Sequence, residues 1–323
     1  MQLSCAFAPS RETPDHIVRA EELGYHRAWC YDSPALYADV WVTLALAATR
    51  TSSIGLGPGV LVPNLRHVMT NAAAIATLVD LAPGRVTLAI GSGFTGARCL
   101  GQKPQRWRDV SAYVEALRAL LRGEDVAWDG SVIRMMHPAG FAPARPVEVP
   151  ILVTAAGPKG VAAAKAVGDG VFFGGTASPS AGEFAHVALL TFGTVLDEGE
   201  DAGSARVMAA AGHSAAVSLH AMYERAPQAL AGVARGAEWM AMIEEIPETT
   251  RHLAVHDLHL VGVSDHDRPF LGPELLAAVA FTPAQVRERL DRFAEQGVTE
   301  VVYQPAGPDI GRELATFAEA AAG

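Results

Sequence analysis

The stretch Glu295-Gln296-Gly297-Val298-Thr299-Glu300-Val301-Val302-Tyr303 indicates the fold of this chain. It joins the end of a helical segment to a glycine, a short turn and a β-branched run. Similar phrases occur at residues 21–29 and 166–173. Glycine just past a helix adopts the left-handed conformation without a Cβ penalty, so each phrase predicts a helix that leads into a strand. The sequence is therefore built from repeated helix–strand units.

Eight strands are predicted, and most are short, nearly continuous apolar runs of the kind found in parallel strands covered on both faces. They span residues 2–8, 26–31, 54–61, 85–90, 151–154, 170–173, 206–211 and 300–304. Apolar residues at helical spacing predict helices between them, for example over 109–121 and 283–296. This alternation predicts an α/β fold, a single (β/α)8 TIM barrel domain over residues 1–323, rather than an open doubly wound sheet.

Two segments depart from the alternation. Residues 126–133 contain Asp129-Gly130, a strong tight-turn signal, and predict a small hairpin. Residues 213–281 are too long for an ordinary connection and predict an insertion before the last helix–strand unit. We expect this insertion to be a lid over the barrel mouth, with a dimer interface as the alternative.

Charge and cysteine content narrow the class of protein. The chain has 25 Lys and Arg against 35 Asp and Glu, a net charge of −10, which argues against nucleic acid as a partner. Its three cysteines fit neither a disulfide framework nor paired zinc ligands. Neither a signal peptide nor a membrane anchor is expected, so the sequence predicts a cytoplasmic protein.

Glycines gather where the predicted strands end, which is where the active sites of TIM barrels lie. Gly91 and Gly93 follow the fourth strand, and Gly174-Gly175-Thr176 end the sixth. Ala156-Gly157-Pro158-Lys159-Gly160 opens a predicted helix. A helix start exposes N–H groups and a positive dipole end, so the last two segments predict a phosphate site. The alternative is that these glycines only make tight turns.

Several strings, in their order along the chain, resemble the luciferase-like flavin monooxygenase family. They are residues 51–63, 71–81, Pro83-Gly84-Arg85-Val86-Thr87-Leu88-Ala89-Ile90-Gly91-Ser92-Gly93, 120–123, 150–158 and 168–170. The same strings occur in its deazaflavin branch, the coenzyme F420-dependent reductases and dehydrogenases similar to methylenetetrahydromethanopterin reductase. The resemblance covers most of residues 1–173 and returns over 282–319.

The resemblance implies a cofactor site at the barrel mouth. Gly59-Val60 matches a non-prolyl cis peptide behind the flavin ring, and Asp32 matches an acidic residue ending the second strand. The glycine segments already noted match the family's flavin-phosphate clamp. FMN is the expected cofactor, with coenzyme F420 as the alternative.

The implied activity is transfer of hydride or activated oxygen to an apolar or mixed organic small-molecule substrate. A non-catalytic flavin-binding protein is a further alternative. The expected partners are a second copy in a homodimer and a reductase that supplies reduced flavin or F420.

Two positions depart from the family's sugar-phosphate dehydrogenases, which have histidine and glutamate where this chain has Ser33 and Phe94. That mechanism is therefore disfavoured, and Phe94 is expected to give the pocket an apolar wall.

Histidines are the remaining candidates for chemistry. His256 and His259 belong to a run that starts with His252, and His213 follows the predicted seventh strand. We expect one or more of His213, His256 and His259 to be catalytic, because imidazole exchanges protons near neutral pH. The spacing also occurs in metal sites on helices, but no metal is expected because the pattern is weak. The alternative is a mixture of surface and core histidines.

Overall fold

The computed structural model describes residues 1–155 and 157–323. Contacts divide the chain into two compact units. The first comprises Met1–Leu190 and Phe293–Val302, and the second comprises Thr191–Arg292 and Tyr303–Gly323.

The first unit is built on a closed eight-stranded barrel in the order β1-β12-β9-β8-β7-β4-β3-β2. Its strands are β1 Gln2–Phe7, β2 Arg27–Cys30, β3 Gly55–Leu61, β4 Leu88–Ile90, β7 Ile151–Thr154, β8 Gly170–Gly174, β9 Val187–Thr191 and β12 Glu300–Tyr303. Neighbours run parallel, as in the pairing of β2 with β3 and of β7 with β8. The predicted (β/α)8 barrel is therefore confirmed.

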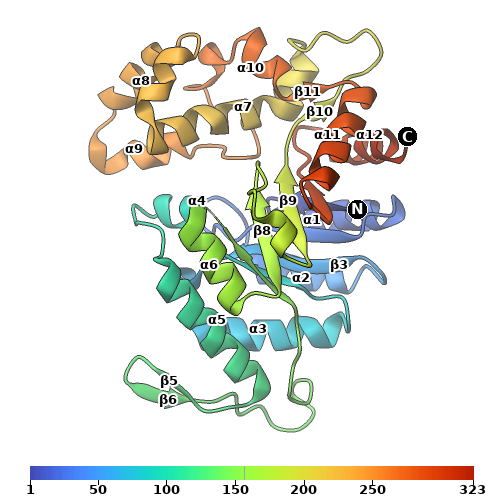
Figure 1. Ribbon diagram of the computed structural model, residues 1–323, viewed down its shortest axis with the longest axis vertical. Helices are drawn as coiled ribbons and strands as arrows, with labels where there is room; N and C mark the ends of the chain where they lie inside the picture. Colours follow the sequence, from blue (N-terminus) through green and yellow to red (C-terminus); the bar gives the residue numbers. More distant parts are fainter. Residues whose placement is uncertain (156) are drawn as a thin grey trace. The chain divides into compact units, whose positions relative to one another are not determined.

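Helices alternate with these strands around the outside of the first unit (Figure 1). They are α1 Thr13–Glu22, α2 Val40–Ala48, α3 Val68–Leu81, α5 Trp107–Arg122 and α6 Gly157–Val167. The helix before β12 in the chain, α11 Pro283–Glu295, belongs mostly to the second unit. Shorter turns are η1 Pro63–Leu65, α4 Phe94–Arg98 and η2 Ala181–Glu183. In α5 the apolar residues Val110, Val114, Leu117 and Leu121 are buried at helical spacing, as predicted.

One strand assignment is wrong. Residues 206–211 lie in the helix α7 Ala205–Arg225, and the barrel strand is β9, which the sequence pattern missed. Ser204 caps this helix, because its hydroxyl accepts a hydrogen bond from the amide of Val207 at 3.1 Å. The Met- and Ala-rich run that follows favours helix. The inserted segment therefore begins shortly after β9 and not at residue 213.

The predicted hairpin is confirmed. β5 Val126–Trp128 pairs antiparallel with β6 Ser131–Ile133, and Asp129 and Gly130 have φ of 47° and 78°. Two positive φ values at the turn match a type I′ hairpin. Figure 1 shows the hairpin near the C-terminal end of α5.

A buried carboxylate joins strands inside the barrel unit. Glu300, which is fully buried, accepts a hydrogen bond from the indole of Trp29 at 2.9 Å. His186 Nε2 lies 2.7 Å from its other oxygen, and Arg27 Nε lies 3.5 Å away. Arg27 also donates to Thr87 at 2.7 Å. These contacts bind β2, β12 and the residue before β9 into one network.

The second unit is mostly helical. It contains α7, η3 Pro227–Gly232, α8 Gly236–Glu245, α9 Glu248–Val255, η4 Arg268–Phe270, α10 Pro273–Ala277 and α12 Ile310–Ala322, with a two-stranded sheet of β10 Thr194–Val195 and β11 Ala280–Phe281. Trp239 is fully buried in its core, and Met240 and Met242 pack against that core. The expected lid and single-domain arrangement stay predictions.

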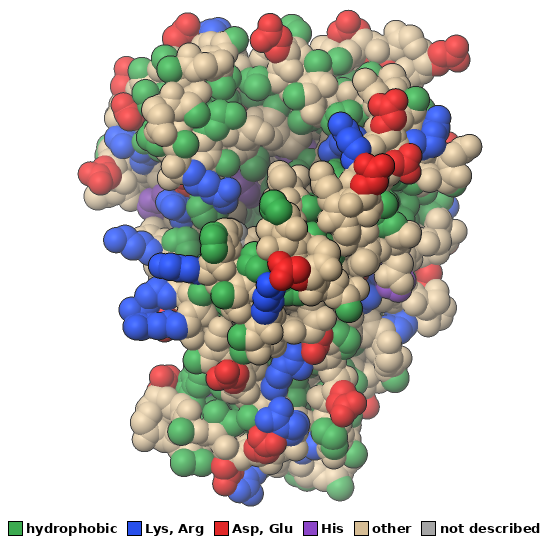
Figure 2. Space-filling view, in the orientation of Figure 1, with side chains coloured by type: hydrophobic (Ala, Val, Ile, Leu, Met, Phe, Trp, Pro, Cys, Tyr) green, Lys and Arg blue, Asp and Glu red, His purple; other side chains and the backbone are tan. Residues whose placement is uncertain are grey.

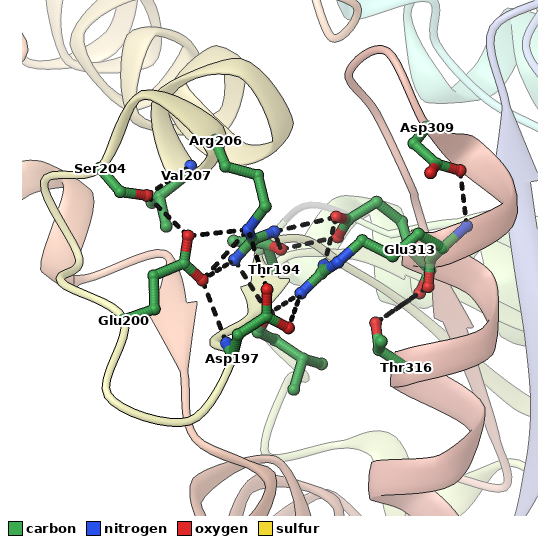
Figure 3. Close-up of polar contacts among 12 residues, drawn as sticks. Thr194, Asp197, Glu200, Ser204, Arg206, Val207, Asp309, Glu313 and Thr316 are labelled. Carbon is green, nitrogen blue, oxygen red and sulfur yellow. Dashed lines mark hydrogen bonds and ion pairs between the residues drawn. The ribbon is translucent and has the colours of Figure 1, made fainter.

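A second ion network joins α7 to α12 within this unit (Figure 3). The buried Glu313 carboxylate lies 2.6 Å from Arg312 and 3.1 Å from Arg206. Thr194 and Tyr303 donate to its other oxygen at 2.6 and 3.2 Å. Because both oxygens of Glu313 have cationic or hydroxyl partners, we interpret the network as stabilising the unit.

Surface charges are mixed in sign. Figure 2 shows acidic and basic side chains next to each other at several points, and Arg122 with Glu124, Arg134 with Asp125 and Lys165 with Glu183 form such pairs. Among the described residues, every helix is too short or too polar to cross a membrane.

Candidate cofactor and substrate site

The ends of β7 and β8 leave room for a ligand. Gly157, which starts α6, and Gly175, which follows β8, have φ of 69° and 78°. Nothing in the described chain lies within 4 Å of a Cβ built at Gly157, Gly174 or Gly175. The start of α6 also presents amides that have no partner inside the helix. The two segments therefore offer an exposed cradle suited to an anion.

Not every predicted residue of this cradle is free to bind. The Gly175 amide donates to the Leu190 carbonyl at 3.0 Å, so it is not free to hold a phosphate. A Cβ on Gly160 would lie 2.8 Å from the Trp107 ring, so this glycine is needed for packing against α5. The remaining candidates, Pro158, Lys159 and Thr176, are exposed, and Pro158 has no N–H to offer. Ala156 lies outside the described residues.

The Gly59–Val60 peptide is cis, as the resemblance implied. Gly91, at the end of β4, lies beside it: a Cβ there would be 3.0 Å from Val60 and 2.6 Å from the Thr154 hydroxyl. A Cβ on Gly93 would lie 2.2 Å from Val62. These glycines let the ends of β3, β4 and β7 pack closely. Their contact with a cofactor stays a prediction.

Asp32 is buried and paired. Arg66 donates to both of its oxygens at 2.6 Å and also contacts Asp39 at 2.7 Å. Burial raises the pKa of Asp32 above its ordinary value, although Arg66 opposes this rise. Asp39 in turn caps α2 by accepting from the Trp41 amide. Asp32 therefore fixes the loop after β2.

The sequence placed Tyr31 at the end of the second strand but assigned no role to it or to Arg66, since neither lies in a pattern with a known role. The Tyr31 hydroxyl is buried and has no hydrogen-bond partner in the described part of the chain. It directly follows β2, and burial raises its pKa well above 10. A buried polar atom without a partner at a strand end is a candidate ligand contact.

The candidate histidines lie in the second unit. His213 lies inside α7, so its predicted place at a strand end is wrong. His256 directly follows α9, and His259 lies in the next turn with its ring centroid 5.3 Å from that of His256. His220 of α7, which the sequence reasoning did not select, lies 6.3 Å from His259. All four side chains are buried.

Two of the four rings have carboxylate partners. His220 Nε2 lies 3.1 Å from Asp267, which also accepts from Trp239 at 2.8 Å and Ser264 at 2.8 Å. His256 Nε2 lies 3.2 Å from Glu224. No group of three His, Cys, Asp or Glu side chains among the described residues has a metal-binding arrangement.

Burial keeps His213 neutral. Its ring is almost fully buried and makes no well-formed hydrogen bond, and burial lowers its pKa from 6.5 to about 4 against a weak contribution from the Ala210 carbonyl. The unfolded chain therefore takes up this proton at higher pH. Stability from His213 is fully present above pH 6.5 and is lost as pH falls towards 4.

We expect the free energy of unfolding of the second unit to fall by about 2 to 3 kcal/mol over that pH range, from a shift of this size. His213→Leu should reduce this fall in stability at low pH, as measured by urea titrations followed by circular dichroism. The exposed His266→Leu is the matched control and should leave the fall unchanged. An identical fall in wild type and His213→Leu would contradict the account.

Comparison with known proteins identifies the family. The sequence profile described as luciferase-like monooxygenase matches residues 4–300. The chain belongs to this family. The match begins within β1, includes all residues from β2 to α11, and ends at Glu300, the first residue of β12.

Among curated proteins, the chain is similar to the 5,10-methylenetetrahydromethanopterin reductase of Archaeoglobus fulgidus, with 26% identity over 97% of this chain and 98% of the relative. A shorter match, with 37% identity, links 51% of this chain to 52% of the F420-dependent glucose-6-phosphate dehydrogenase of Beutenbergia cavernae. Both relatives are oxidoreductases, and the second is named as F420-dependent, which supports an enzyme.

Solved structures share the fold at low identity. An F420-dependent secondary alcohol dehydrogenase in complex with an F420-acetone adduct has a TM-score of 0.66 at 17% identity, covering 99% of this chain and 98% of that chain. The FMN complex of a type II Baeyer-Villiger monooxygenase from Pseudomonas putida has a TM-score of 0.60 at 14% identity, covering 100% and 98%.

Proposed function

We propose that this protein is a coenzyme F420-dependent oxidoreductase that transfers hydride to or from a small organic substrate. The observation that carries the proposal is the exposed glycine cradle at the start of α6 and the end of β8, in a family whose curated relatives here include F420-dependent enzymes. These relatives favour F420 over FMN, which reverses the order expected from the sequence.

The residues of the barrel unit fit such a cofactor. The amides at the start of α6, beside Gly157, would hold its phosphate, with Lys159 and Thr176 at the rim. The cis peptide at Gly59–Val60 and the glycines Gly91 and Gly93 would border its ring system. Bound F420 would supply a two-electron hydride transfer without oxygen. Tyr31 gives the site a hydroxyl whose buried oxygen still needs a partner.

We propose that histidine side chains of the second unit contact the substrate. Burial lowers the pKa of His259 well below 6.5, with His256 and His220 adding to the shift, and His213 is neutral as well. A neutral imidazole can donate a hydrogen bond to a carbonyl oxygen that gains negative charge as hydride arrives. We propose that one or more of His213, His256 and His259 has this role.

FMN with oxygen is the second candidate, supported by the likeness to the FMN-bound monooxygenase. Apolar side chains exposed on α2 and α3, namely Val42, Leu46 and Leu81, support a homodimer. We also propose a reductase partner that supplies reduced cofactor. The proposed location is cytoplasmic. Three buried free cysteines agree with a reducing compartment.

Anaerobic turnover tests the proposal. Reduced F420 is mixed with the protein and a panel of ketones, aldehydes, enones and imines, and recovery of the oxidised cofactor spectrum is followed. We expect substrate-dependent oxidation of F420 without oxygen. Turnover only with reduced FMN in air would establish the monooxygenase instead, and cofactor binding without turnover would favour a binding protein.

A further inference from the structure

A strained turn carries His259 in the second unit. Leu258 and Leu260, on either side of it, have φ of 51° and 60°. Side chains other than glycine rarely adopt this left-handed region, and a leucine gains no local hydrogen bond there. Such conformations persist where surrounding contacts enforce them, and they cluster at functional sites.

Gln304 supplies a contact that enforces the turn. Its side-chain Nε2 donates to the Leu260 carbonyl at 2.8 Å and to the Pro305 carbonyl at 3.1 Å. Its own amide donates to the Thr191 carbonyl at 3.0 Å. The residue is 2% exposed and directly follows the strand β12. The glutamine is thus anchored through its backbone and reaches the turn through its amide group.

The turn brings His259 into the histidine cluster. Its ring is buried beside those of His256 and His220, and His213 adds to the same electrostatic environment. Asp267 is the acidic group that opposes these effects, and it is already hydrogen-bonded to His220, Trp239 and Ser264. The backbone turn and the neighbouring rings therefore help to set the orientation of His259.

The polar atoms near this turn that have no hydrogen-bond partner in the described chain include Gln304 Oε1 and His256 Nδ1. His213 likewise lacks a well-formed hydrogen bond. Burying a polar group without a hydrogen-bond partner costs free energy, and hydrogen bonds from a ligand would offset this cost. All of these groups are uncharged or already paired with a carboxylate, so they match an uncharged oxygen or nitrogen better than a phosphate or carboxylate.

We infer that Gln304 is a positioning residue, which holds the turn Leu258–Leu260 so that His259 can donate a hydrogen bond to an uncharged carbonyl or hydroxyl of the substrate. This inference rests on the proposed role of the histidines in turnover. It goes beyond that role by naming the residue that orients His259 and the substrate class, a ketone, aldehyde or alcohol without a charged group near the reacting carbon.

Gln304→Met tests the inference, because methionine keeps the length of the side chain but cannot donate to Leu260. Gln296→Met, at an exposed position, is the matched control. The histidine rings are observed by NMR in the full-length protein after histidine-selective labelling, with the His259 signal assigned from His259→Asn. We expect the wild-type His259 signal to stay that of a neutral ring well below pH 6.5.

In Gln304→Met we expect the His259 ring to change its tautomer ratio or to titrate at higher pH, while His220 keeps its signal because Asp267 still holds it. Turnover of a neutral ketone should fall by about 10-fold in kcat with little change in KM, because a weakened hydrogen bond to the reacting oxygen changes the rate by about this factor. Unchanged His259 signals in Gln304→Met would overturn the positioning role, whatever the stability of the variant.

If the His259 signal shifted in Gln304→Met but His259→Ala kept full turnover, Gln304 would still hold the turn. The proposed contact between His259 and the substrate would then be overturned. Should Gln304→Met not fold, Gln304→Glu has the same size but cannot donate when ionised, and the same signals are then compared.

A ketone that carries a carboxylate beside the reacting carbon should be a poorer substrate than its methyl ester. Equal kcat/KM for acid and ester would contradict the substrate class.

Discussion

Replacing Glu300 with glutamine will lower the free energy of unfolding of the barrel unit by about 3 to 5 kcal/mol, the usual cost of breaking a buried ion pair on one side. The carboxylate is fully buried, and the neutral amide would leave Arg27 without its counter-charge and His186 without its carboxylate partner. Urea unfolding followed by tryptophan fluorescence measures the change, since Trp29 bonds to Glu300 directly.

The pH dependence gives an independent check on this network. Burial opposes ionisation of Glu300, but the His186 hydrogen bond and Arg27 outweigh it and lower the pKa from 4.5 to about 2. Because the folded pKa is the lower one, the stability is present above pH 4.5 and is lost as pH falls from 4.5 to about 2. We expect Glu300→Gln to lack this loss of stability at low pH, because a glutamine amide does not titrate.

Glu295→Gln is the matched control, since Glu295 is exposed at the end of α11. It should change stability by no more than about 0.5 kcal/mol, as surface substitutions do. If Glu300→Gln unfolded at the same urea concentration as this control, the network would have no net stabilising role.

Placing aspartate at Gly157 will weaken binding of the phosphate-bearing cofactor by about 100-fold. A like charge about 4 Å from the phosphate costs several kcal/mol at the effective dielectric of a protein surface, and exposure reduces this to about 3 kcal/mol. The free protein should tolerate the change. No other part of the described chain crowds the position, and an acidic residue suits the first turn of α6.

Gly157→Asn separates charge from shape. Asparagine and aspartate have the same size and both tolerate the left-handed φ of 69° at this position. We expect the asparagine variant to bind the cofactor within about 5-fold of wild type, far from the loss in the aspartate variant. Equal losses in the two variants would indicate a steric effect, and no loss in either would move the phosphate site away from α6.

The barrel could be predicted from the sequence because its signals are local. Two local signals, short apolar runs and glycines that follow helices, located seven of the eight strands. Asp129-Gly130 located the hairpin. Strand β9 was missed because its run Val187–Thr191 has no such glycine before it, while the Met- and Ala-rich run 206–211 resembled a buried strand. The capping role of Ser204 was the signal that could have corrected this.

The site was less predictable because its contacts are long-range. Asp32 was selected, but its partner Arg66 lies 34 positions away and belongs to no motif. Gly175 was placed in the phosphate cradle, but its amide is used by Leu190 in the neighbouring strand. His220 joins the histidine cluster through the packing of α7 against the turn after α9, which spacing in the sequence does not encode.

Parallel titrations of the wild-type protein with oxidised F420 and with FMN test the central claim most directly. Tryptophan and cofactor fluorescence report binding, and the proposed function requires one F420 per chain, bound at least about 10-fold more tightly than FMN, a difference of about 1.4 kcal/mol. The account predicts that result, together with displacement of F420 by excess inorganic phosphate at the α6 site. FMN binding as tight as F420, or binding of neither, would contradict it.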